Sequence, residues 1–272
     1  MTTTTVDRTA PVGHPASDYG LSLPAEVGLL FRRRLRQAWR APMWIFAGMA
    51  TPLLYLVLFV PLLRSLPTGL WGGAGAAQMF MPGMLVMLAF SAGSGIGWTI
   101  LHELDGGVIE RLRVTPVRRV SLLLGTELRD ALMCVVPAAV VAAVSMAFGF
   151  TVHLAGALLM LVLLALVAMA LSAVSTAVAL LVKQIGTLAA IISGVQVPLM
   201  LLSGVLLPVS LGPTWLKVLA HANPLYYAVE ASRDLALGRI TTGTVGLGFL
   251  VTAVATALAV TWGTRVLQKA VA

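Results

Sequence analysis

The chain has 272 residues, of which 59% are hydrophobic and only 10% are charged. A soluble domain has about a quarter of its residues charged, so this composition excludes an ordinary soluble protein. Long runs without an ionisable residue indicate membrane spans instead. The net charge of +8 does not indicate nucleic-acid binding, because the basic residues flank the apolar runs, as the positive-inside rule expects.

The N-terminal part divides into a tail and an amphipathic helix. Residues 1–24 are rich in Thr, Pro and Ser, which predicts a disordered cytoplasmic tail. In 25–41, apolar residues recur every four positions on one helix face, at Val27, Phe31, Leu35 and Trp39. Basic residues lie away from that stripe, at Arg32, Arg33, Arg36 and Arg40. This pattern predicts an interfacial helix that lies flat at the level of the lipid headgroups, with Trp39 near the interface.

Six apolar runs follow, each at or near the length of roughly 20 residues that a helix needs to cross the hydrocarbon core. We expect spans at 43–63, 78–101, 131–150, 154–182, 187–207 and 245–264. The chain is therefore predicted to be an all-α integral membrane protein, with one six-span domain over 42–272. The single cysteine, Cys134, lies in an apolar run and is interpreted as a small buried hydrophobic residue.

The distribution of basic residues predicts the orientation. With the N-terminus inside, the cytoplasmic side would hold Arg32, Arg33, Arg34, Arg36, Arg40, Arg111, Arg113, Arg118, Arg119, Arg129, Lys183, Arg265 and Lys269. The outer side would hold Arg64, Lys217, Arg233 and Arg239. This asymmetry in short loops predicts that both termini are cytoplasmic. No predicted span has a charged residue near its middle, which disfavours a proton-coupled or sodium-coupled transporter.

Gly93 and Gly97 in the second predicted span form a Gly-x-x-x-Gly pattern. Small residues at this spacing let two helices approach closely. Packing within the same chain is the favoured interpretation, ahead of contact with a second copy.

A polar stretch at 102–119 separates the second and third spans. It crowds charged residues together at Glu103, Asp105, Glu110, Arg111 and Arg113. Gly106-Gly107 breaks the chain direction, and Thr115-Pro116 ends any helix because a residue before proline is pushed out of the helical region. The stretch predicts a short helix at the cytoplasmic face, although composition alone supports a solvated charged loop equally well.

A second unusual stretch, 208–243, is too long for a turn and too apolar for a plain loop. Asn223-Pro224 is a turn signal, so we expect two short re-entrant helices that divide there. Glu230 and Arg233 are three residues apart and can pair on one helix. A structural brace at the outer end is favoured over direct contact with a substrate.

Both stretches resemble signatures of one family. The segment from Glu103 to Val117, with Gly107, Glu110, Leu112 and Thr115-Pro116-Val117, resembles the loop signature of type-2 ABC exporter permeases. Near the C-terminus, Pro213 to Leu216, Asn223 to Leu225, Tyr227, Arg233 and Gly238 resemble that family's outer segment. The resemblance covers nearly the whole chain after about residue 25, and its nearest subgroup is the daunorubicin-resistance type of drug-efflux permease.

The resemblance implies roles for three groups of residues. The cytoplasmic loop would be a coupling helix that docks on an ATP-binding subunit through Glu103, Asp105, Gly107, Glu110, Arg111, Thr115 and Pro116. The interfacial helix, with Phe31, Arg32, Arg33, Arg36 and Trp39, would lie beside the same subunit. The outer segment, with Trp215, Asn223, Pro224, Tyr227, Glu230 and Arg233, would close the outer gate.

The implied partners are an ATP-binding cassette ATPase, a second permease copy or related permease, and membrane lipids, with no nucleic acid. The chain has no Gly-x-x-x-x-Gly-Lys-Ser/Thr phosphate loop, so ATP and Mg would bind the partner ATPase, and no cofactor or metal is expected here. Catalysis is not expected on this chain either, so the chain is not expected to be an enzyme.

The expected cargo is a hydrophobic or amphiphilic compound, most naturally a drug or antibiotic, carried out across the cell membrane. A lipid or polysaccharide exporter of the same family, an ion-coupled secondary transporter or channel, and a lipid-modifying membrane enzyme are the alternatives. The enzyme is disfavoured because no spacing for metal or nucleophile chemistry appears.

Overall fold

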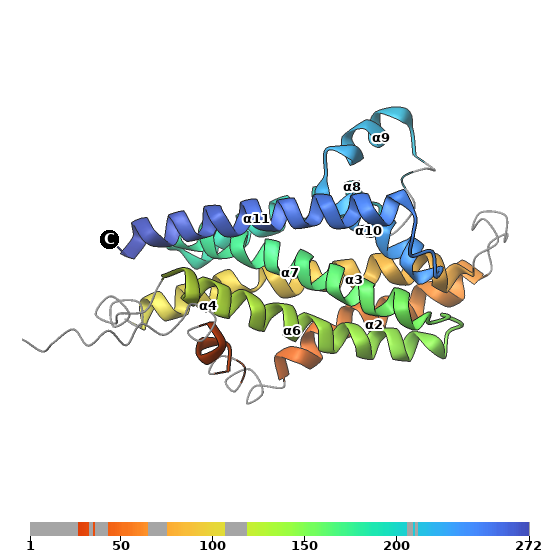
Figure 1. Ribbon diagram of the computed structural model, residues 1–272, viewed down its shortest axis with the longest axis horizontal. Coiled ribbons are helices and arrows are strands. Elements are labelled where there is room, and N and C mark those ends of the chain that lie inside the picture. Colours follow the sequence, from red (N-terminus) through yellow and green to blue (C-terminus); the bar gives the residue numbers. More distant parts are fainter. Residues whose placement is uncertain are drawn as a thin grey trace, which may run out of the picture.

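The computed structural model describes residues 27–32, 35, 43–64, 75–106, 119–205, 209 and 212–271. All regular structure in these residues is helical, as the sequence predicts. The helices are α2 (Met43–Arg64), α3 (Ala76–Ser94), α4 (Ile96–Asp105), α6 (Arg119–Met146), α7 (Leu154–Val182), α8 (Ile185–Ser203), α9 (Thr214–His221), α10 (Pro224–Ala236) and α11 (Gly243–Val271). The long helices run along the long dimension of one bundle (Figure 1).

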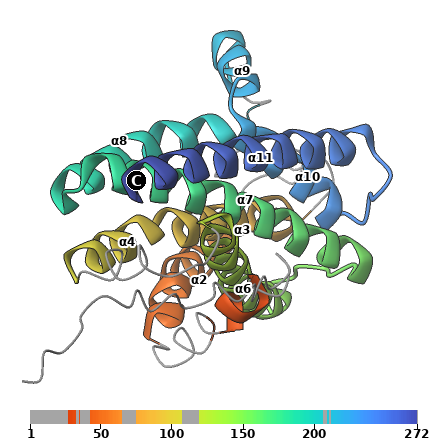
Figure 2. The same ribbon diagram turned by 60° about the vertical axis from the view of Figure 1, so that its left-hand side comes forward.

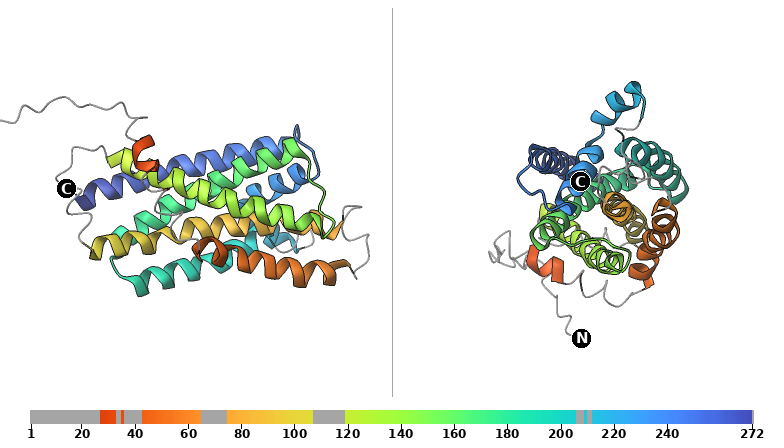
Figure 3. Two further views of the ribbon diagram at one scale, coloured as in Figure 1. Left: turned by 90° about the horizontal axis from the view of Figure 1, so that it is seen from below. Right: turned by 90° about the vertical axis from the view of Figure 1, so that its right-hand side faces the viewer.

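Helix α7 occupies the centre of this bundle. It packs against α3, α4, α6, α8, α10 and α11, whereas α8 has few neighbours and α9 projects from the side (Figures 1 and 2). Seen end on, the remaining long helices surround α7 and α3 (Figure 3). A central helix must be apolar on most of its circumference, and the sequence of α7 is almost entirely aliphatic.

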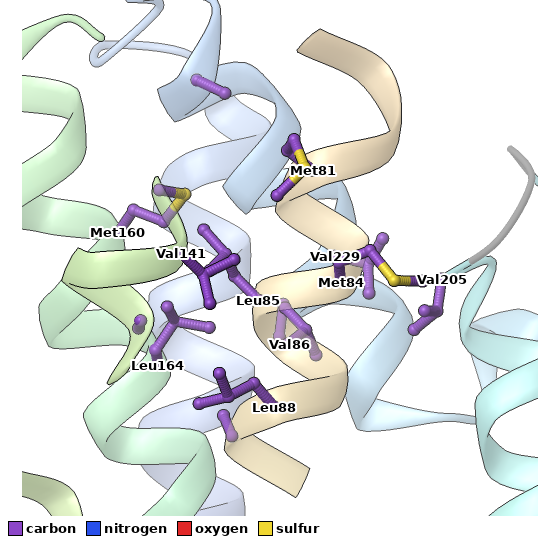
Figure 4. Packing of buried hydrophobic residues seen from close by; sticks show 14 of the residues in the cluster. Met81, Met84, Leu85, Val86, Leu88, Val141, Met160, Leu164, Val205 and Val229 are labelled. Carbon is purple, nitrogen blue, oxygen red and sulfur yellow. The ribbon is translucent and has the colours of Figure 1, made fainter. Parts of the chain in front are cut away.

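The core lies where α3 meets α6, α7 and α10. On α3, Met81, Met84, Leu85 and Val86 are completely buried. Figure 4 shows them beside Val141 of α6, Met160 and Leu164 of α7, and Val229 of α10. Three consecutive residues of α3 are buried, so protein surrounds this helix. A helix in that position must be apolar around its circumference, rather than along one stripe.

Five helices are long and apolar enough to cross a membrane. They are Ala77–His102, which joins α3 and α4, Leu124–Met146, Leu154–Val182, Ile185–Ser203 and Gly243–Lys269. Helix α2 contributes a shorter apolar stretch, Met49–Leu62, within the described side chains. The first predicted span therefore corresponds to a helix, while a six-span layout stays a prediction.

The second predicted span is not one continuous helix, because it breaks between α3 and α4 at Gly95. Ser175 of α7 inserts its hydroxyl at the break. Ser175 Oγ donates to Ser94 O at 2.6 Å and accepts from Gly97 N at 3.0 Å. A side chain that enters the backbone hydrogen-bond ladder is a known cause of helix irregularity.

The third predicted span has the wrong start. It was expected at 131–150, but α6 begins at Arg119 and ends at Met146. Glu127, Arg129 and Asp130 made this part resemble a loop, yet Glu127 and Asp130 are buried at 0% and 2% exposure. Charged residues therefore lie in the first part of a span, although not at its middle.

The Gly-x-x-x-Gly pattern serves packing within the chain, as predicted. A Cβ on Gly93 would lie 2.5 Å from Ala168 O, and a Cβ on Gly97 would lie 2.6 Å from Ser175 Oγ. Both contacts are with α7. The two glycines therefore let the backbones of α3 and α4 touch the central helix.

We expect Gly93→Ala to lower the free energy of unfolding by about 1–3 kcal/mol, because the added methyl group meets backbone that cannot yield. Gly194→Ala in α8 is the matched control, since nothing lies within 4 Å of its added Cβ. There the change should be neutral or stabilising by about 0.5–1 kcal/mol. Thermal unfolding of the purified protein in detergent compares the two, and equal effects would contradict the packing role.

Candidate functional site

The predicted coupling loop lies mostly outside the described residues. Of its predicted docking residues, Gly107, Glu110, Arg111, Thr115 and Pro116 fall in 107–118, which the structure does not describe. Glu103 and Asp105 belong to α4, but their side chains are not described. The docking role of these residues therefore stays a prediction.

The helices on either side of this loop are well defined. Helix α4 ends at Asp105, and the N–H of Gly106 donates to His102 O at 3.0 Å. Helix α6 begins at Arg119, at the same end of the bundle as the C-terminus of α11 (Figures 1 and 3). Both of these helices pack against α7.

A short helix at 27–32 lies against the start of α6, where the interfacial helix 25–41 was predicted. A Cβ on Gly125 would lie 2.9 Å from Leu30 Cβ and 3.4 Å from Phe31 N. Phe31 is half-buried and Arg32 is exposed, while a position at the membrane interface stays a prediction. Arg33, Arg36 and Trp39, like the predicted tail at 1–24, lie outside the described residues.

Within the stretch 208–243, the predicted outer segment, the described residues form two helices, α9 and α10, before the start of α11, and these divide at Asn223, as predicted. Asn223 caps α10, because its Oδ1 accepts from Leu225 N at 3.0 Å. Its Nδ2 also donates to Leu199 O of α8 at 2.8 Å. Pro224 occupies the first turn of α10, where its missing N–H costs nothing. The boundary therefore follows from local sequence, while entry of these helices into a membrane stays a prediction.

Arg233 joins α10 to two other helices through hydrogen bonds. Its side chain is 4% exposed, and its Nη1 lies 2.6 Å from Glu230 Oε1, which confirms the predicted pair. Its Nη2 donates to Gly204 O at the end of α8 at 2.6 Å, and its Nε donates to Met79 O of α3 at 3.3 Å. One guanidinium group thus links three helices, which agrees with the interpretation as a brace.

Trp215 and Tyr227, two other predicted gate residues, are more exposed than Arg233. Trp215 on α9 is 64% exposed, and its neighbours Val218 and Leu219 are also exposed. Tyr227 is half-buried, and its hydroxyl donates to His221 O at 3.0 Å. Helix α9 therefore presents an apolar surface away from the bundle, while α10 is anchored in it.

Sequence reasoning missed a second polar cluster near Arg233. Gln78 Nε2 donates to Thr151 O at 3.0 Å and to Ala236 O, and Gln78 Oε1 accepts from Thr151 N at 2.9 Å. His153 Nδ1 lies 3.2 Å from Ala236 O. Gln78 itself could have indicated this cluster. It is a lone amide at the start of an apolar span, and a buried amide needs hydrogen-bond partners.

Arg233→Met is expected to destabilise the protein by about 3–5 kcal/mol, because it leaves the buried Gly204 carbonyl without its charged donor. Glu230→Gln is the control: Glu230 is 32% exposed, so its loss should cost about 1 kcal/mol or less. Thermal unfolding in detergent measures both changes. Equal losses would show that the ion pair, rather than the contacts between helices, is the stabilising element.

The chain is similar to one family of membrane proteins and to several known members of it. The chain matches the family model for the ABC-2 type transporter over residues 25–237. The putative transport permease ycf38 of Pyropia yezoensis is 27% identical over 220 residues, which are 80% of this chain and 76% of that protein.

Two drug-resistance proteins are also similar. Daunorubicin resistance ABC transporter permease protein DrrB1 of Streptomyces coeruleorubidus is 27% identical, over 80% of each chain. Probable doxorubicin resistance ABC transporter permease protein DrrC of Mycobacterium tuberculosis is 25% identical, over 84% of this chain and 83% of that protein. Since the family match covers most of its length, the chain belongs to the ABC-2 type transporter membrane family and is a multi-pass transport permease.

Proposed function

We propose that this permease is the membrane subunit of an ATP-driven exporter that moves a hydrophobic or amphiphilic compound out of the cell. The family match over 25–237 carries the proposal, because ABC-2 type permeases in general work with an ATP-binding subunit. ATP and its Mg would bind on that separate chain. The likeness to proteins named for daunorubicin and doxorubicin resistance supports a drug or antibiotic as cargo.

The bundle supports transmission of force from the 107–118 loop. Helices α4 and α6 flank the loop, and both pack on α7. Docking of the ATPase through Glu110, Arg111 and the neighbouring loop residues would therefore move two bundle helices together. The short helix at 27–32, which touches α6 at Gly125, would lie beside the same partner.

In the proposed topology α2 is a sixth span, and both termini are cytoplasmic. The alternation of helices along the bundle supports this, since α4, the start of α6 and the end of α11 share one end (Figure 1). Helices α9 and α10 lie toward the opposite, outer end. There, the anchorage of α10 by Arg233 would support an outer gate.

Within the same family, a lipid or polysaccharide exporter is the alternative. A sugar pathway needs aromatic rings that face a channel. Three aromatic residues of α2 and α3 instead pack on one another: the ring centres of Tyr55 and Phe59 are 5.3 Å apart, and those of Phe59 and Phe80 are 5.6 Å apart. All three belong to the apolar core or pack against it, which favours a drug or lipid over a polysaccharide.

Glu110→Ala tests the coupling role. We expect normal insertion in the membrane but at least a tenfold loss of ATPase stimulation, because a docking contact at the loop is removed. Arg239→Ala is the control, since Arg239 is an exposed residue in the turn before α11, at the predicted outer end. The measurement is ATP hydrolysis by the reconstituted complex with each permease variant. Wild-type stimulation in Glu110→Ala would remove the docking role, and transport without any ATPase would overturn the exporter proposal.

The topology is tested with single cysteines at positions 239 and 269, introduced after Cys134→Ala; Cys134 itself is completely buried. A membrane-impermeant maleimide added to intact cells should label Arg239→Cys and spare Lys269→Cys. After lysis both should react. Labelling of position 269 in intact cells would contradict a cytoplasmic C-terminus.

A further inference from the structure

The apolar core of the described residues divides into two clusters, and α3 and α4 belong to different ones. The larger cluster joins α3 to the first half of α7 and to parts of α2, α6 and α10. The smaller cluster joins α4 to the last turns of α7 and the first turns of α8, where Leu101, Ala179 and Leu188 are buried. The two halves of this span are therefore packed separately, one on each side of Gly95.

Buried hydroxyl side chains lie between the two clusters on α7. Ser172, Ser175 and Thr176 are all 3% exposed or less. They follow the α7 residues of the larger cluster and precede those of the smaller one. At this level, the contact between α7 and the span depends on hydrogen bonds, which can pass from one partner to another.

The Ser175 hydroxyl group takes the place of two backbone partners. In a continuous α-helix, Gly97 N would donate to Gly93 O, and Ser94 O would accept from the N–H four residues further on. Instead, Gly97 N donates to Ser175 Oγ at 3.0 Å, and Ser175 Oγ donates to Ser94 O at 2.6 Å. The same backbone groups therefore have partners in two arrangements, one with the hydroxyl group inserted and one with the helix continuous.

The backbone has room to rotate at Gly95 but not at Gly93. A Cβ added at Gly95 would come no closer than 3.5 Å to Ser91 O and 3.8 Å to Ala92 O, both in the preceding turn. A Cβ added at Gly93 would lie 2.5 Å from Ala168 O of α7. Since glycine accepts a wide range of backbone angles, α4 can rotate at Gly95 while α3 stays in contact with α7.

The other end of α3 is joined to its neighbours by side-chain hydrogen bonds. Gln78 Nε2 donates to Thr151 O at 3.0 Å and to Ala236 O at the end of α10. Arg233 of α10 donates to Met79 O at 3.3 Å. Helix α4 instead packs on α7 and α8. Movement within this span is therefore easier in α4 than in α3.

We propose that Gly95 is a hinge in the span that α3 and α4 form, and that the Ser175 hydroxyl group is its latch. In the structure the hydroxyl group is inserted at the hinge. In a second conformation it leaves, Gly97 N donates to Gly93 O, and α3 and α4 form one continuous helix. Ser175 Oγ then donates to Leu171 O, one turn back on α7, as serine hydroxyl groups do within helices.

The hinge gives the end of α4 two positions. The helix has 10 residues, so it is about 15 Å long. A rotation of about 20° at Gly95 moves its end by roughly 5 Å. Because α4 directly precedes residues 107–118, the two conformations differ where that stretch begins. This hinge goes beyond the exporter proposal and does not rest on it, since both conformations belong to the permease alone.

The test is the distance between two spin labels, measured by pulsed electron paramagnetic resonance on the purified permease in lipid nanodiscs. The labels are attached at His102→Cys on α4 and Arg265→Cys on α11, in a Cys134→Ala background. Both positions are exposed, and α4 and α11 end at the same end of the bundle (Figure 1). With Ser175 present, we expect two distances that differ by roughly 5 Å.

Ser175→Ala removes the latch. Ser94 O and Gly97 N then lack a partner only in the conformation that needs the inserted hydroxyl group. The population of the second distance relative to the first should therefore rise about tenfold. A purely structural serine would lower stability but leave the two populations in the same ratio, and that result would overturn the hinge.

Two controls accompany this variant. Ser145→Ala removes a buried hydroxyl group that donates to Ala142 O within its own helix, and should leave the ratio unchanged. Labels at Ser91→Cys and Arg265→Cys report on α3 before the hinge, and should give one distance with or without Ser175. A change of the same size in this second label pair would show that the whole span moves, which would also overturn the hinge.

If Ser175→Ala does not fold, Ser175→Thr and Ser175→Val provide the second comparison. Both add the same bulk at this position, and only threonine keeps the hydroxyl group. We expect the ratio of the second distance to the first to be about tenfold higher in the valine variant. Equal ratios in the two variants would overturn the proposal.

Discussion

Close backbone contact between the central helix α7 and the pair α3–α4 is the constraint on which the rest of the bundle depends. Lipid tails are as apolar as leucine, so helices in a membrane gain little from apolar burial alone and must fit closely. Gly93 and Gly97 allow that fit along one side of α7. On another side, Gly156 of α7 meets the backbone of Leu235 in α10 without a side chain between them. Helix α7 can therefore contact many helices at once, and each of them is positioned through it.

At the break between α3 and α4, a hydroxyl group of α7 binds backbone groups of both helices. Where α3 and α4 separate, Ser94 O and Gly97 N lose their helical partners, and Ser175 Oγ replaces both. Ser175 therefore satisfies two backbone groups at the break inside the bundle.

The sequence predicts the all-helical architecture and several helix boundaries, because its strongest signals are local. Apolar length identified the long helices, and Asn223-Pro224 identified the division of α9 from α10, because capping and proline act within a few residues. Spacing alone identified the Glu230–Arg233 pair. The contacts of Arg233 with Met79 O and Gly204 O could not be predicted, since they join residues that only the folded chain brings together.

The start of α6 was missed for a related reason. Charged residues next to an apolar run normally indicate a loop, and Glu127 to Asp130 have that appearance. Burial by neighbouring helices overrides the composition, and no local signal reports it. The candidate sites differ in the same respect: the docking residues at 107–118 rest on family resemblance, whereas the links that Arg233 makes between helices follow from contacts that the structure describes.

The buried charge of Arg233 shows how one ionic group can hold several helices of this bundle together. Arg233 is surrounded by two carbonyl oxygens and a carboxylate, so its charge is fully used in holding helices together. A buried charge destabilises a fold unless it is paired, so each of these three oxygens offsets part of the cost of burying Arg233. Two of them belong to α3 and to the end of α8, so the contacts that satisfy the charge are also the contacts that join α10 to those helices.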